Sequence, residues 1–128
     1  DMSGLFVNFD RFNQNIASWD TSNVANMANM FQSATDFNQD ISGWNTALVE
    51  NMSSMFEDAV AFDIDISCWN IVNVRHFDKM FSGAIKFVIG LCWEPRLEAG
   101  FNNMFYMTGG QESGAAYIDS TCIASGCN

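Results

Sequence analysis

The apolar residues of this chain recur with a period of 25 residues, and each period has two halves. In one half the apolar positions lie three and four residues apart, as at Met52, Met55 and Phe56, which is the spacing of one face of a short helix. In the other half, around Ile41 and Trp44, sparse apolar residues are flanked by Ser, Thr, Gly and Asn, which favours a short extended segment between turns. Each period therefore predicts a helix, a turn, an extended rung and a second turn.

Two aromatic columns mark the repeat. Their members are Phe12, Phe37, Phe62 and Phe87, followed at a constant offset, one residue early in the last unit, by Trp19, Trp44, Trp69 and Trp93. A unit of this length cannot enclose a core alone, but stacked units bury matching residues in one continuous stripe. We therefore predict an α/β repeat solenoid whose coils each hold a short helix and a short parallel strand, with neighbouring rungs about 4.8 Å apart. The residues expected in its core are Phe12, Phe37, Phe62, Phe87, Met27, Met52, Met55 and Phe56.

The repeat also resembles a known family. The pattern Phe-Asn-Gln-Asp-Ile-Ser-x-Trp-Asn/Asp-Thr-Ser-Asn-Val-x-x-Met-x-x-Met-Phe-x-x-Ala is similar to the 25-residue repeat of BspA-like surface proteins, which include mycoplasma-type lipoproteins of unknown function. The resemblance implies leucine-rich-repeat-like coils, an extracellular or cell-surface location and no catalytic residues. It covers residues 1–108, a solenoid of four to five repeats, and leaves residues 109–128 as a loop-rich tail or cap with a cysteine pair. The chain opens in the middle of a unit, which predicts an upstream segment that it lacks.

The four cysteines suggest disulfides. Cys68 and Cys92 each precede the repeat tryptophan in consecutive units, so stacking would bring them to disulfide distance. Cys122 and Cys127 could close a small loop in the tail, although four cysteines allow three pairings and free thiols are the alternative. Disulfides favour an oxidising, extracellular compartment, which the Asn-Met-Ser glycosylation sequon at Asn51 also fits. The alternative role for Asn51 is to cap the predicted helix that it begins.

Composition and charge exclude several classes of protein. The chain has 128 residues, of which 48% are hydrophobic and 14% aromatic, enough for one folded domain. Its net charge is −10, and its five Lys and Arg residues are scattered, which argues against nucleic-acid binding. No apolar run approaches the roughly twenty residues that a transmembrane helix needs.

The sequence offers few candidate catalytic or metal-binding residues, and we expect that the chain is not an enzyme and needs no cofactor. Asp40 and Asp65 occupy one repeat position, where stacking could pair the carboxylates, raise one pKa, or bind calcium. The first unit has Asn15 at this position, which a solvated turn tolerates. We therefore favour a solvated turn over a calcium site, and a calcium site over a catalytic pair. His76 stands where other units have Asn, without a Ser or Cys nucleophile beside it.

The tryptophan column leaves two interpretations open. Trp19, Trp44, Trp69 and Trp93 either fill the core or form a surface ladder that stacks on sugars or a partner protein. The favoured function is a non-enzymatic recognition or adhesion module that presents a repetitive face to a glycan or protein at the cell surface. The alternative is a structural subunit that polymerises with itself through its ends into a filament or surface layer, because the ends of a stack expose unpaired rungs.

Overall fold

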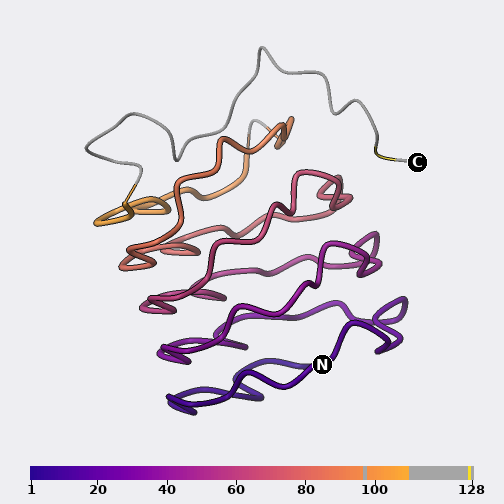
Figure 1. Cartoon of the computed structure of the whole chain (residues 1–128). Coiled ribbons are helices and arrows are strands. Elements are labelled where there is room, and N and C mark those ends of the chain that lie inside the picture. Colours follow the sequence, from indigo (N-terminus) through magenta and orange to yellow (C-terminus); the bar gives the residue numbers. More distant parts are fainter. Residues whose placement is uncertain (97, 110–126, 128) are drawn as a thin grey trace.

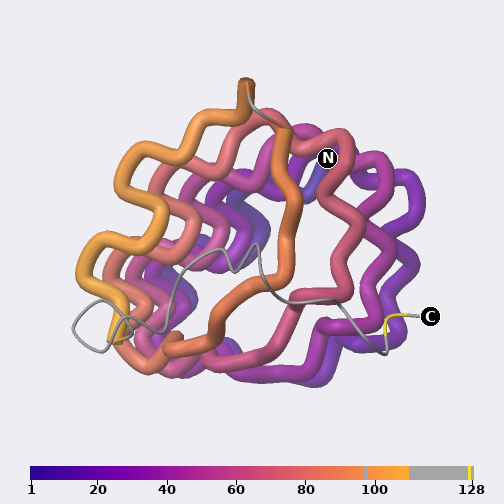
Figure 2. Tube along the Cα trace, turned by 90° about the horizontal axis from the view of Figure 1, so that it is seen from above, coloured from indigo at the N-terminus to yellow at the C-terminus, as the bar shows by residue number. Residues whose placement is uncertain are grey.

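The chain forms a stack of similar coils that lie one above another (Figure 1) and nearly superimpose when seen from above (Figure 2). This computed structural model describes residues 1–96, 98–109 and 127. Isolated parallel bridges link Asn26 to Asn51, Asn51 to His76, and His76 to Gly100, so they mark the same point in successive coils. We number the coils from these bridges: residues 1–25, 26–50, 51–75, 76–99 and 100–109.

The coils are built of turns, and the predicted helix-plus-strand unit is wrong. Among the described residues there is no helix, and regular β pairing is limited to isolated bridge positions. The fold is therefore not the α/β, leucine-rich-repeat-like solenoid that the sequence and the family resemblance suggested. With no helix in this part of the chain, nothing in it is long and apolar enough to cross a membrane as a helix.

The segment predicted as a helix is a run of consecutive β-turns. In the second coil, the N–H of Met30 donates to the carbonyl of Met27 at 3.2 Å, and the N–H of Ala34 donates to that of Phe31 at 3.0 Å. Asn29 and Ser33 have positive φ of 59° and 58°, a left-handed conformation that interrupts a right-handed helix. Met27, Met30, Phe31 and Ala34 are nevertheless all buried, at the spacing of one helix face, so the apolar spacing cannot distinguish the turns from a helix.

Alternate N–H groups of this segment bind the next coil instead of their own. Met27 donates to the carbonyl of Asn51 at 3.0 Å, and Phe31 donates to that of Met55 at 2.9 Å. Asn29 and Ser33 donate across the same interface, so four bonds at alternate residues join the second coil to the third. A helix would use these donors internally. Pairing with a neighbouring coil therefore takes the place of helix formation.

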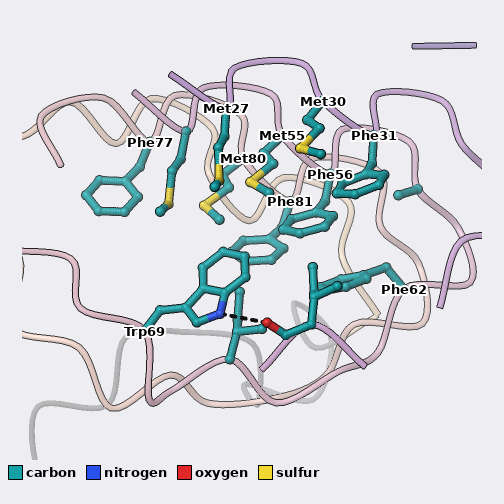
Figure 3. Close-up of a cluster of buried hydrophobic side chains, with 14 of the residues drawn as sticks. Met27, Met30, Phe31, Met55, Phe56, Phe62, Trp69, Phe77, Met80 and Phe81 are labelled. Atoms are coloured by element: carbon teal, nitrogen blue, oxygen red, sulfur yellow. Dashed lines mark hydrogen bonds between the residues drawn. The ribbon is translucent and has the colours of Figure 1, made fainter. Parts of the chain in front are cut away.

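Columns of aromatic rings and methionines fill the core (Figure 3). The Phe31 ring lies 3.9 Å from that of Phe37 in its own coil and 5.6 Å from that of Phe56 in the next. The expected core residues with 0% exposure are Phe37, Phe62, Phe87, Met27, Met52, Met55 and Phe56. Phe12 is only partly buried, because it belongs to the first coil, which has one neighbour.

The cysteine pairing differs from the one suggested by stacked positions. Cys68 is bonded to Cys127, with a Cα–Cα distance of 5.1 Å, rather than to Cys92. Because the fourth unit is one residue short, the N–H of Cys92 lies 3.5 Å from the Ser67 hydroxyl, one position away from Cys68. Cys92 is also disulfide-bonded. Cys122 and the tail from residue 110 to 126 lie outside the described residues.

Substitution of Gly83 by alanine is expected to destabilise the fold by about 1–3 kcal/mol. Gly83 has a φ of +73°, and an added Cβ would clash with the Asp58 carboxylate of the preceding coil. Gly43→Ala is the matched control, because a Cβ at Gly43 meets nothing within 4 Å and no left-handed φ is present. Urea unfolding of both variants provides the measurement, and equal stabilities would contradict a close approach of coils at Gly83.

Candidate functional site

Three of the four tryptophans lie in the core and fasten the coils together. Trp44, Trp69 and Trp93 are 4%, 3% and 2% exposed. The indole N–H of Trp69 donates to the carbonyl of Ile41 in the preceding coil at 3.1 Å (Figure 3). Trp44 and Trp93 make the equivalent bonds at 3.2 and 3.3 Å. These three residues therefore form no ligand face, and only Trp19, in the first coil, is exposed, at 37%.

The exposed amide column is also occupied in holding coils together. The side-chain oxygen of Asn13 accepts the N–H of Asn38 at 2.9 Å, and that of Asn38 accepts the N–H of Asp63 at 2.9 Å. The Gln39 amide adds a bond to Asn13 at 3.0 Å. Since each acceptor serves the next coil, this column is structural.

Asp40 and Asp65 each bind a serine in their own turn. Asp40 accepts the N–H of Ser42 at 3.0 Å and its hydroxyl at 2.6 Å, while Asp65 accepts the N–H of Ser67 at 2.9 Å. The two bonds from Ser42 lower the pKa of Asp40. A carboxylate pair that shared a proton would instead raise the pKa of one member. Within residues 1–96, 98–109 and 127, no three His, Cys, Asp or Glu residues gather as a metal site would require.

The substitution Ser42→Ala should raise the pKa of Asp40 towards its ordinary value, because the hydroxyl is the main group that lowers it. A lowered folded-state pKa stabilises the fold above the ordinary Asp pKa of 3.8, and this stabilisation is lost as pH falls through the lowered pKa. A carboxyl-carbon NMR titration measures the change, and Asp20, which binds Ser22 in the same way, provides an internal reference that should not move. An unchanged titration of Asp40 would contradict the assignment.

Asn51 closes a turn rather than a helix. Its side-chain oxygen accepts the N–H of Ser53 at 2.9 Å, as that of Asn26 accepts the N–H of Ala28 at 3.0 Å. This is the same acceptor chemistry that an N-cap uses. Glycosylation of Asn51 stays a prediction.

A pocket on the side of the stack gathers much of the basic charge of this acidic chain. It has a volume of about 370 Å³ and is lined by Arg75, His76, Arg96, Glu98 and Ala99. We call it the side pocket. The Nε–H of Arg96 donates to the carbonyl of Val72 at 2.6 Å, which directs the guanidinium. No charged side chain of the side pocket belongs to an ion pair within the described part of the chain.

Sequence reasoning missed the side pocket, although the repeat contains a signal for it. Arg75 stands where earlier coils have Ala25 and Glu50, and His76 stands where they have asparagine. Arg96 belongs to the shortened fourth coil. Exposed residues that depart from the repeat therefore lie together in the side pocket. The register of the coils was needed to see this.

The two end coils present complementary unpaired backbone groups. Among the described residues, none donates a backbone bond to the carbonyls of Ser3 and Leu5, although the matching carbonyls of inner coils each accept one from the coil before. In the last described coil, the N–H groups of Asn103 and Phe105 donate to no carbonyl within residues 1–96, 98–109 and 127. The first coil also exposes Phe9 to 58%, beside a shallow hollow of about 510 Å³.

Comparison with known proteins identifies a family. A family model described as "Mycoplasma protein of unknown function, DUF285" matches residues 1–113. No curated protein matches the chain. No solved structure matches it either. Functional inference therefore depends on the chemistry of the surface.

Proposed function

The chain belongs to this mycoplasma family of unknown function, and we propose that it is a non-enzymatic recognition module of an extracellular or cell-surface protein. Family membership is consistent with the BspA-like surface repeat that the sequence resembles, and a disulfide between Cys68 and Cys127 suits an oxidising location. The proposed partners are glycans or proteins at the cell surface.

The side pocket is the observation that carries this proposal. Most of the repeated Phe, Met and Trp side chains lie in the core, and the repeated Asn side chains bind backbone N–H groups of their own turn or of the next coil. The side pocket instead holds two arginines and a histidine, whereas the whole chain has only five Lys and Arg residues and one His. The charged side chains of the side pocket form no ion pair with other described residues, so they are available to a ligand.

Glycan and extracellular-protein arrays probed with the labelled chain test recognition. The intact chain should bind a defined subset of the array, and Arg75→Gln should weaken that binding. Lys86→Gln is the matched control, because it removes the same charge from an exposed residue outside the side pocket. Absence of any binding by the intact chain, or an equal loss in both variants, would overturn a role for the pocket in recognition.

A second candidate function is assembly of copies end to end, which the unpaired groups of the end coils favour. In the register of the inner interfaces, Asn103 and Phe105 of one copy would donate to Ser3 and Leu5 of the next. Such a contact is heterologous and does not close, so it would produce a filament. It would also cover Phe9.

We expect the sedimentation-velocity mass of the chain to rise with concentration if the ends pair, and Phe9→Asp to keep it monomeric. Leu48→Asp is the control, since Leu48 is also exposed, at 52%, but lies in an inner coil. A monomer at every concentration would rule out assembly and leave recognition intact.

A further inference from the structure

We propose that the side pocket binds a carboxylate that also bears hydroxyl groups, as an acidic monosaccharide does. This proposal rests on the proposed recognition function and names the ligand class of the same site. The volume of the side pocket, about 370 Å³, is at the small end of the range for ligand pockets. It suits one compact group better than an extended chain.

The side pocket is lined by side chains whose hydrogen-bond donors suit a carboxylate. Arg96 uses its Nε–H on the carbonyl of Val72, which leaves the terminal N–H groups of its guanidinium for a ligand. The side chains of Arg75 and His76 make no hydrogen bond to other described residues. Guanidinium groups bind carboxylates through paired, charge-assisted hydrogen bonds. Two arginines and an imidazole therefore line one pocket, which suits it to an anionic group.

Glu98 narrows the choice of anion. Its carboxylate lines the same pocket and has no ion-pair partner among the described residues, so it would repel a ligand that is negative throughout. A carboxylate accepts hydrogen bonds from hydroxyl groups. A ligand with a carboxylate at one side and hydroxyls at another satisfies both the arginines and Glu98, whereas an acidic peptide side chain satisfies only the arginines.

His76 gives up a structural role that its equivalents perform. Asn26 and Asn51 each accept an N–H from their own turn, at 3.0 and 2.9 Å, and His76 makes no such bond within the described part of the chain. Nothing in the packing of the coil requires an imidazole there, because His76 is exposed. Its place beside Arg75 in the side pocket is consistent with a role in binding.

Because the net charge of the chain is −10, an anionic ligand needs close hydrogen bonds in the side pocket in order to bind. The acidic chain as a whole repels anions, so long-range attraction does not bring the ligand in, and close hydrogen bonds must supply the affinity. We therefore expect binding to depend on the individual arginines more than on ionic strength.

Three small probes of differing chemistry test the proposal by NMR titration of the intact chain. D-glucuronate has both the carboxylate and the hydroxyls, D-glucose has only hydroxyls, and glutarate has only carboxylates. Glucuronate should shift the side-chain signals of Arg75, Arg96 and His76 with the strongest affinity. Arg75→Gln should weaken its binding about tenfold or more, and Lys86→Gln should not change it.

Other outcomes separate the ligand class from recognition itself. Equal binding of glutarate and glucuronate, or equal effects of Arg75→Gln and Lys86→Gln, would overturn the proposal. Failure of glucuronate to bind, with array binding that still depends on Arg75, would reject this ligand class and preserve recognition. If neither glucuronate nor any array ligand binds, recognition is rejected as well. Unchanged thermal unfolding of Arg75→Gln shows that the variant is folded.

Discussion

Substitution of Phe56 by alanine should lower the free energy of unfolding by about 3–5 kcal/mol, the largest effect expected of one substitution here. Phe56 is 0% exposed, and its ring lies 3.9 Å from that of Phe62 and 5.6 Å from those of Phe31 and Phe81. Removing the ring leaves a cavity between three coils. The coils cannot collapse into it easily, because backbone hydrogen bonds hold their spacing.

Urea unfolding followed by tryptophan fluorescence measures this loss. Phe9→Ala is the matched control, since Phe9 belongs to the same residue type but is 58% exposed in the first coil. We expect the control to change stability by less than about 1 kcal/mol. Similar losses in both variants would mean that the aromatic column is not the core of the fold.

Substitution of Ala59 by phenylalanine should destabilise the chain by about 1–3 kcal/mol or prevent folding. Ala59 is 0% exposed, as are Ala34 and Ala84 at the same position of neighbouring coils. Phe9 occupies this position in the first coil, where it points into solvent for most of its surface. An inner coil has no such space, because a neighbouring coil lies on each side.

Thermal unfolding of Ala59→Phe alongside Ala25→Phe tests this expectation. Ala25 is exposed, so the same added ring at this position has room. Equal stability of the two variants would contradict a close approach of coils along the alanine column. Unfolding of Ala25→Phe alone would contradict the assigned register.

Local pattern identified the repeat and misidentified its elements. The spacing of Met52, Met55 and Phe56 matched a helix, but positive φ at Ser54 and Asp58 breaks any helix there. Of the ten positive-φ residues in the described part of the chain, eight are not glycine, so glycine positions did not reveal this conformation. The left-handed residues are tolerated because bonds to the neighbouring coil hold them in place.

Contacts that only the structure shows decide the roles of side chains that the sequence left ambiguous. Trp69 could have faced solvent or core, and the carbonyl of Ile41, 28 residues earlier, holds it inside. Cys68 could have met Cys92, but the missing residue of the fourth unit shifts the register by one. Asp40 could have paired with Asp65, but its carboxylate accepts hydrogen bonds from Ser42, two residues away.

The sequence by itself determined the 25-residue period, the apolar columns and the acidic charge. These properties are repeated in every unit and can be read without knowing how units meet. Only the tertiary structure decided that the coils are made of turns, that three tryptophans lie between coils, and that Arg75, His76 and Arg96 share a pocket. The physical reason is that alternate backbone N–H groups bind carbonyls about 24 residues further along the chain. No local pattern contains that partner, so the choice between helix and turn depends on the neighbouring coil.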